Sequence, residues 1–182
     1  MAQALFIVDL QNDFLPGGAL AVPAGDEVIA PINELAADER FALTIATRDW
    51  HPAGHSSFLE QGGPWPPHCV HGTFGAQLND RLNLDRIDVI IDKGIEPDAS
   101  GYSAFERPEL PDLLAARGID TVTIVGLATD FCVVHTAQGA LHAGLTVTVE
   151  RAGIRGIDAD RSERALADLR ADGATIRDVE HG

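Results

Sequence analysis

The chain has 182 residues, of which 45% are hydrophobic, and this is enough to bury a core, so we expect one domain over residues 1–182. Its formal net charge of −15 argues against binding to nucleic acid or to anionic membranes and favours a small neutral or cationic substrate. No apolar run approaches the ~20 residues of a membrane span, and the first residues lack a basic leader. We therefore expect a cytoplasmic protein. Its two cysteines form neither a CxxC motif nor a disulfide framework, which suits a reducing compartment.

Apolar runs bounded by turn-forming residues alternate with stretches of helical spacing along the chain. We expect strands over residues 4–9, 41–47, 87–93, 121–125, 145–149 and 174–177. We expect helices over residues 26–36, 75–82, 108–117 and 158–171, and a further helix that has Cys132 in its first turn. Asp26 is the expected N-cap of the first helix, and Pro31 predicts a kink or a late start in it. This alternation predicts an α/β fold, a three-layer α/β/α sandwich with a mainly parallel six-stranded sheet.

Polar side chains follow the first two expected strands. Asp9 ends the first strand and opens onto a loop rich in turn formers, so it is either a candidate acid/base or a turn aspartate. Asp49 and His51, two residues apart on an extended segment, project to the same side and can share a metal ion. A proline-stiffened stretch then supplies His68 and His71. One carboxylate with two histidines is a common catalytic set for zinc or iron(II), the alternative being solvated loop histidines.

Lys93 ends the third expected strand. It is the single lysine of a chain whose other twelve basic residues are arginine. A lysine is ordinarily a solvated surface cation. Here the preference for arginine elsewhere favours a specific use for a compact ammonium, beside a thiol and a carboxylate.

Cys132 follows the strand over 121–125 and stands at the start of a stretch with helical spacing. Thr129 or Asp130 is the expected N-cap of that helix. The first turn of a helix lowers the pKa of a thiol, so we interpret Cys132 as a nucleophile rather than a small buried hydrophobe. Because the carboxyl ends of parallel strands meet at one edge, Cys132 and the candidates at the other strand ends should form one site.

Six motifs, in order along nearly the whole chain, carry a family resemblance: Val8-Asp-Leu-Gln-Asn-Asp-Phe14, Asp49-Trp-His-Pro52, Trp65-Pro-Pro-His-Cys-Val70, Lys93-Gly94, Tyr102-Ser-Ala-Phe105 and Gly126-Leu-Ala-Thr-Asp-Phe-Cys132. The sequence resembles the nicotinamidase/pyrazinamidase branch of the isochorismatase-like cysteine hydrolases. The Asp–Lys–Cys set marks the superfamily. Asp-x-His together with Trp-Pro-Pro-His is the specific signal for the branch.

The resemblance implies hydrolysis of nicotinamide to nicotinate and ammonia through a thioester. Cys132 would be the nucleophile, Asp9 the general base and acid, and Lys93 the cation that holds both. The resemblance further implies one divalent metal ion, zinc or iron(II) with manganese as a third choice, held by Asp49, His51 and His68. It implies a pyridine pocket lined by Phe14, Trp65, Tyr102 and Phe131, and an oxyanion hole of the N–H groups of Ala128 and Cys132 next to a cis Leu127–Ala128 peptide.

Some residues depart from the family pattern and leave the ligand count open. Phe74 replaces a usual proline, and His71 stands where glutamine or serine is common. His71 is a competing ligand by position, and His55 is an additional ligand in some relatives with different spacing. Metal identity, oligomeric state, including a homo-oligomer, and the preferred carboxamide stay open as well.

Three alternative functions compete with this one. The first alternative is another isochorismatase-like amidohydrolase, such as an isochorismatase or a carbamoyl amidase, which lacks the metal pair. The second is a hydrolase in which metal-bound hydroxide attacks while Cys132 is inert. A binding module without activity is the third, and the presence of all three candidate catalytic groups argues against it.

Overall fold

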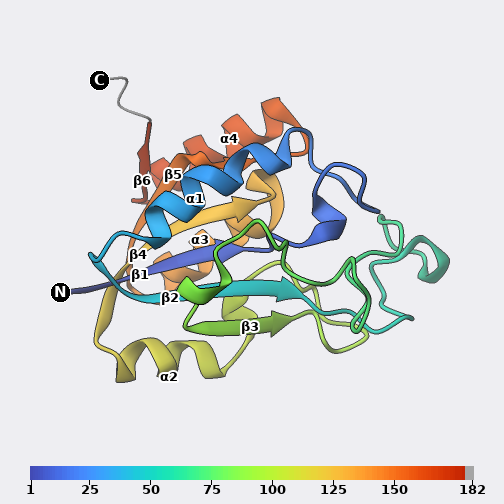
Figure 1. Ribbon diagram of the computed structural model, residues 1–182, viewed down its shortest axis with the longest axis horizontal. Coiled ribbons are helices and arrows are strands. Elements are labelled where there is room, and N and C mark those ends of the chain that lie inside the picture. Colours follow the sequence, from blue (N-terminus) through green and yellow to red (C-terminus); the bar gives the residue numbers. More distant parts are fainter. Residues whose placement is uncertain (179–182) are drawn as a thin grey trace.

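A computed structural model describes residues 1–178, and the predicted domain extends beyond it to residue 182. Six strands form one sheet in the order β3-β2-β1-β4-β5-β6, and each neighbouring pair is parallel (Figure 1). Their bounds are β1 (Ala2–Val8), β2 (Phe41–Asp49), β3 (Val89–Lys93), β4 (Ile119–Leu127), β5 (Thr146–Arg155) and β6 (Thr175–Arg177). The predicted parallel six-stranded sheet is confirmed.

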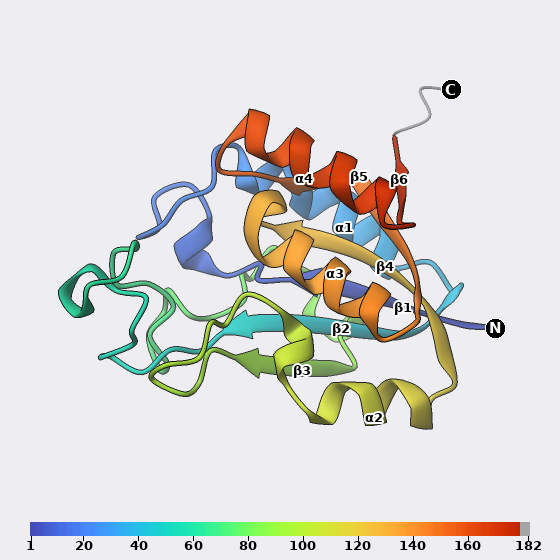
Figure 2. The same ribbon diagram turned by 180° about the vertical axis from the view of Figure 1, so that it is seen from behind.

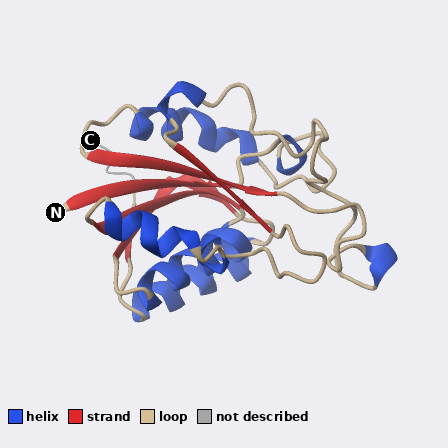
Figure 3. Ribbon diagram, turned by 90° about the horizontal axis from the view of Figure 1, so that it is seen from below, coloured by secondary structure: helices blue, strands red, loops and turns tan. Residues whose placement is uncertain are grey.

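Helices cover both faces of the sheet. One face is covered by α1 (Ile29–Ala36), which lies in front of the strands in Figure 1. The other is covered by α2 (Glu109–Ala116), α3 (Val134–His142) and α4 (Ala159–Ala171), which Figure 2 shows from the front. Figure 3, seen along another direction, shows the resulting three layers. None of the described helices has the length and apolar character needed to cross a bilayer.

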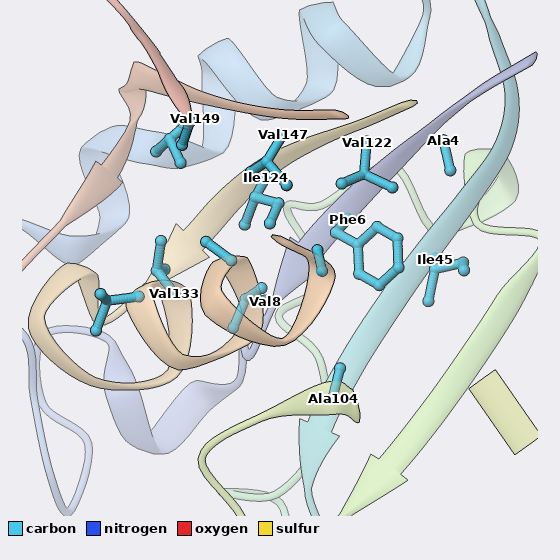
Figure 4. Close-up of a cluster of buried hydrophobic side chains, with 14 of the residues drawn as sticks. Ala4, Phe6, Val8, Ile45, Ala104, Val122, Ile124, Val133, Val147 and Val149 are labelled. Carbon is cyan, nitrogen blue, oxygen red and sulfur yellow. The ribbon is translucent and has the colours of Figure 1, made fainter. Parts of the chain in front are cut away.

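The central strand β1 shows why the sheet is buried on both sides. Successive side chains of a strand point to opposite faces. Ala4, Phe6 and Val8 therefore join the core beneath α2, α3 and α4, which Figure 4 shows in close-up. Leu5 and Ile7 join the core beneath α1. All five are fully buried, so the strand is apolar throughout rather than alternating.

Two helix predictions were wrong in detail. Residues 75–82 form turns rather than a helix, because their backbone pairs with another segment: the N–H groups of Asn12 and Asp13 donate to Gln77 and Gly75. The first helix is preceded by a 3-10 turn over Gly25–Val28 that has no side-chain cap, so Asp26 does not cap it. The predicted late start is confirmed, since α1 begins only at Ile29 and has Pro31 in its first turn, where a missing N–H costs little.

Candidate active site

The carboxyl edge of the sheet gathers the candidate groups from four adjacent strands. Asp9 follows β1, Asp49 and Lys93 are register partners at the ends of β2 and β3, and Cys132 lies in the turn after β4. The acceptor oxygens of Asp9 and Asp49 and the sulfur of Cys132 all lie within 4.8 Å of one another. The structure thus brings together four side chains that are far apart in the sequence.

The close approach of β1 and β4 at this edge requires a glycine. Gly126 has φ +117°, and a Cβ at that position would lie 2.1 Å from the carbonyl oxygen of Val8. Any side chain would push the two strands apart just where Asp9 and the turn of Cys132 leave them. The glycine that opens the motif before Cys132 therefore sets the spacing between the two groups.

Lys93 occupies the centre of the site and is fully buried. Its Nζ lies 2.7 Å from Asp9 Oδ2, 2.6 Å from Asp49 Oδ1, 2.5 Å from the carbonyl oxygen of Gly101 and 3.4 Å from Cys132 Sγ. Burial favours the neutral amine, but the facing carboxylates of Asp49 and Asp9 outweigh it and hold the pKa of Lys93 well above its usual value. The group is an ammonium ion that touches both a carboxylate and the thiol.

Asp9 is held in an unusual backbone conformation. Its φ is +50°, a region that residues other than glycine rarely occupy, and strain of this kind concentrates at functional sites. Thr47 Oγ1 donates to Asp9 Oδ1 at 2.7 Å, while Lys93 holds the other oxygen. Burial raises the pKa of Asp9, and the ammonium opposes it only in part. A raised pKa makes the ionised carboxylate a better proton acceptor.

The environment of Cys132 differs from the sequence-based expectation. The residue is 6% exposed, and it belongs to a π-helical turn over Thr129–Val133 that precedes α3. Burial, and next the negative charge of Asp9, raise the pKa of the Cys132 thiol well above its usual value. The predicted lowering of the thiol pKa is therefore wrong, because desolvation beside a carboxylate outweighs the attraction of Lys93. The neutral thiol is therefore favoured over the thiolate in this environment.

The predicted N-cap of this helix is also wrong. Neither Thr129 nor Asp130 caps the turn. The Asp130 carboxylate instead accepts hydrogen bonds from the N–H groups of Ile157 and Asp158, at 3.0 and 3.1 Å. Arg161 Nη2 approaches the same carboxylate at 2.8 Å. Asp130 therefore links the turn of Cys132 to the start of α4.

A second group, of three buried side chains, has the composition of a metal site. Asp49 Oδ2 lies 3.4 Å from His51 Nε2 and 3.7 Å from His68 Nε2, and the three atoms fall within 4.8 Å of one another. His51 Nδ1 is 2.9 Å from the Gly94 carbonyl oxygen, and His68 Nδ1 is 2.8 Å from that of Pro66. A carbonyl only accepts, so each Nδ1 carries a hydrogen, and in the neutral ring this leaves the Nε2 lone pair for a metal ion. The donor set fits a divalent ion.

The two additional histidines lie outside this group. His55 is buried and stacks on His51 with ring centroids 3.9 Å apart, while its Nδ1 bonds to Ser57 Oγ at 2.7 Å. His71 is exposed. Gly94 allows the close packing of His51, because a Cβ at Gly94, with φ +63°, would lie 2.4 Å from the imidazole.

A narrow pocket opens between the two groups. It is lined by Phe14, Leu20, Val22, Asp49, Trp65, His68, Tyr102, Ala128, Phe131, Cys132 and Ile157. Trp65 Nε1 donates to Tyr102 Oη at 3.0 Å, and the rings of Trp65 and Phe131 meet edge to face. The four aromatic residues named from the sequence all line this pocket. The Leu127–Ala128 peptide is cis, as the resemblance implies.

Sequence reasoning missed several residues of the site. Leu20, Val22 and Ile157 line the pocket from loops that show no periodic pattern. Thr47 and Gly101 hold Asp9 and Lys93 through a hydroxyl and a carbonyl. Thr47 had one usable signal, since it ends the expected strand next to Asp9. A backbone carbonyl such as that of Gly101 has no side-chain signal.

A doubly wound parallel sheet with a cysteine, a carboxylate and a lysine at its carboxyl edge defines an α/β enzyme of the cysteine-hydrolase type. The chain belongs to the isochorismatase domain family, whose model matches residues 3–181.

Among its relatives, the chain is 39% identical over 199 residues to a nicotinamidase of Escherichia coli strain K12, which covers 96% of this chain and 93% of the relative. The crystal structure of the pyrazinamidase of Pyrococcus horikoshii in complex with zinc is 46% identical, with a TM-score of 0.92 over 98% of this chain and 99% of that one. The structure of PnC1 from L. infantum in complex with nicotinate gives a TM-score of 0.94 at 38% identity, over 97% and 92%.

Proposed function

We propose that the chain is a nicotinamidase/pyrazinamidase that hydrolyses nicotinamide to nicotinate and ammonia within one domain. The observation that carries this proposal is the position of Lys93, whose ammonium contacts Asp9, Cys132 and the candidate metal ligand Asp49. A nucleophile and a ring-anchoring group then lie at one pocket. The names of the relatives at 39% and 46% identity support the same substrate class.

The proton path follows from the arrangement. Asp9 takes the proton of the Cys132 thiol, and the sulfur attacks the amide carbon, forming a C–S bond and a tetrahedral oxyanion. The N–H groups of Ala128 and Cys132, two residues that line the pocket, would donate to this oxygen. Asp9 returns the proton to the departing amine, the C–N bond breaks and ammonia leaves. Proton transfer of this kind contributes typically about 10²–10⁴-fold to the rate.

The second half of the reaction uses the same residues. Asp9 takes a proton from water, and the hydroxyl oxygen attacks the thioester carbon. The C–S bond breaks and the sulfur recovers a proton, so nicotinate is released and the site returns to its starting state. Lys93 stays charged throughout and holds Asp9 and Cys132 at a fixed separation.

Asp49, His51 and His68 would hold the divalent ion, for which zinc, iron(II) and manganese are the candidates. When bound, the ion would supply a Lewis acid for the pyridine nitrogen. The hydrogen bonds from His51 and His68 to backbone carbonyls fix their rings for that purpose. The pocket walls formed by Phe14, Trp65 and the neighbouring aromatic residues would orient a flat ring.

Replacement of the nucleophile tests the proposal. Cys132→Ala should abolish ammonia release from nicotinamide while the fold and nicotinamide binding persist. Cys69→Ala is the matched control, since Cys69 is equally buried and free but lies outside the pocket lining. Mass spectrometry of the wild-type chain quenched during turnover should detect the acyl-enzyme on Cys132.

A Cys132→Ala protein that keeps a tenth of the wild-type rate would overturn the thioester route and favour attack by metal-bound hydroxide. Faster hydrolysis of isochorismate or an N-carbamoyl compound than of nicotinamide would instead place the chain in another branch of the family. Benzamide, which lacks the ring nitrogen, should show a higher KM than nicotinamide with a smaller change in kcat.

A further inference from the structure

Three consecutive side chains after β1, those of Gln11, Asn12 and Asp13, reach into the long segment between β2 and β3. That segment includes only two short 3-10 turns and carries the candidate ligands His51 and His68. In Figure 1 it is the teal and green chain that leaves the end of β2 and then runs back along the sheet to the start of β3. Because this segment has little regular structure of its own, its position depends on hydrogen bonds from other parts of the chain.

Gln11 clamps the backbone of Asp49. Its side-chain Nε2 donates to the Asp49 carbonyl oxygen at 2.7 Å and to that of Ala76 at 2.8 Å, while its Oε1 accepts from the Asp49 N–H at 2.8 Å. The partners fix the orientation of the amide, since a carbonyl only accepts and an N–H only donates. Gln11 is fully buried. A residue held at both its N–H and its C=O keeps its Cα–Cβ direction, so Gln11 fixes the point from which the Asp49 side chain leaves the backbone, and Lys93 Nζ then holds its carboxylate.

Asp13 holds the backbone next to His68. Asp13 Oδ2 accepts from the N–H of Cys69 at 2.8 Å. Cys69 has φ +47°, a left-handed conformation that is unfavourable for a residue with a side chain. The hydrogen bond from Asp13 offsets part of that cost and fixes the chain direction directly after His68. Two of the three candidate ligands are thereby tied to the turn that follows Asp9.

Asn12 provides the comparison within the same turn. Its Nδ2 donates to the Phe74 carbonyl oxygen at 2.9 Å, and its Oδ1 accepts from Asn79 Nδ2 at 2.9 Å. These two bonds hold the same long segment, at distances similar to those of Gln11 and Asp13. Neither partner is adjacent to a candidate metal ligand, so Asn12 stabilises the segment without fixing the orientation of such a ligand.

We infer that Gln11 and Asp13 are positioning residues of the proposed metal centre. Both residues hold the candidate ligands in place before the ion binds. The inference rests on the proposed metal site of Asp49, His51 and His68. Without the clamp, part of the binding free energy is spent on ordering Asp49. Loss of such an outer partner typically lowers metal affinity by about 10- to 100-fold.

The test measures Zn²⁺ affinity directly, by competition with a chelating indicator, in the full chain. Gln11→Met preserves side-chain length without adding charge, and it should weaken Zn²⁺ binding by about 10- to 100-fold. Asp13→Ala should weaken it as well. Asn12→Ala, the matched control, should keep the wild-type affinity even if its melting temperature falls. The visible spectrum of the Co²⁺-substituted protein, which reports ligand geometry, should change in Gln11→Met and not in Asn12→Ala.

Several results would overturn the inference. Wild-type affinity in Gln11→Met would leave Gln11 with a structural role only, and equal losses in Gln11→Met and Asn12→Ala would show that loosening the segment suffices. If Gln11→Met does not fold, the comparison of Asp13→Ala with Asn12→Ala decides by the same criterion. A wild-type chain that binds no Zn²⁺, Co²⁺, Mn²⁺ or Fe²⁺ would overturn the proposed metal site along with the clamp.

Discussion

Lys93 is the residue that joins the two halves of the site. One oxygen of Asp9 and one of Asp49 share its ammonium, at 2.7 and 2.6 Å. The second oxygen of each carboxylate is then free for a separate partner: Thr47 Oγ1 at Asp9, and the two imidazoles at Asp49. A single buried cation therefore orients both the base of the proposed reaction and a candidate metal ligand.

The substitution Lys93→Arg tests this role because it conserves the charge. A planar guanidinium is wider than an ammonium and would spread Asp9, Asp49 and Cys132 apart, and reacting geometry is sensitive to shifts of about 1 Å. We expect kcat/KM for nicotinamide to fall on the order of 100-fold. Arg164→Lys, at an exposed position on α4, is the control and should be silent. Near-normal turnover in Lys93→Arg would contradict a role of Lys93 in the proposed catalytic set of Asp9, Lys93 and Cys132.

At low pH, the fall of kcat/KM with pH should report the pKa of Asp9. Burial raises the pKa of this carboxyl above its usual value, and a general base acts only when it is ionised. As the pH falls through the raised pKa, Asp9 becomes protonated and kcat/KM should fall tenfold per unit. The apparent pKa read from this fall should thus lie above the pKa of ~3.9 of an ordinary aspartate. A steady-state profile of kcat/KM, with circular dichroism to confirm folding, measures it; a constant rate down to pH 4 would contradict the assignment.

The chemical types of the site residues could be predicted from the sequence, but their environments could not. Asp9, Lys93 and Cys132 were named because each ends or follows an expected strand. The thiol pKa was predicted with the wrong sign, since local position indicates a helix terminus while only the tertiary structure reveals burial beside Asp9. The role of Gln11 depends on partners 38 and 65 residues away, which no local pattern contains.

At the scale of elements, the apolar runs located all six strands. Strand bounds differ mainly at the ends: β4 and β5 extend beyond the predicted residues because their carboxyl ends continue into polar or glycine-containing sequence. The segment 75–82 was predicted as a helix and is not one, because its backbone groups are taken by the turn after β1. Competition of this kind between local and distant hydrogen bonds leaves no trace in residue spacing.

The contact between α4 and the turn of Cys132 gives a prediction at this scale. Arg161 lies over the Phe131 ring at 4.7 Å and pairs with Asp130. Arg161→Ala should loosen Phe131 in the pocket wall and raise the KM for nicotinamide about two- to fivefold, as expected for a cation–π contact of about 0.5–1 kcal/mol, with little change in kcat. Arg164→Ala on the same helix is the control. Steady-state kinetics measure the effect, and equal KM values for the two variants would refute it.

Metal binding should stabilise the whole molecule. An ion that binds only the folded chain adds about 2.7 kcal/mol to the free energy of unfolding at 100 times its Kd. In a chain of this size each kcal/mol moves Tm by about 2–4 °C, so saturating Zn²⁺ should raise Tm by about 5–10 °C over the chelated protein. Thermal unfolding followed by circular dichroism measures the shift.

Two histidine variants control this measurement. His51→Ala removes a candidate ligand and should abolish the zinc-dependent shift, whereas His142→Ala, at an exposed position on α3, should retain it. A wild-type Tm that is identical with zinc and with chelator would count against a metal site.

The strand order has a consequence for synthesis on the ribosome. β1 emerges first but lies in the middle of the sheet, and one of its two neighbours is β4 (Ile119–Leu127). Translation adds about 5–20 residues per second, so one edge of β1 waits several seconds for its partner. During that time the apolar strand Ala2–Val8 presents unpaired backbone groups, which invite pairing with other nascent chains. Translation intermediates that end before β4 should therefore aggregate or occupy chaperones, and the yield of refolded protein should fall as its concentration rises.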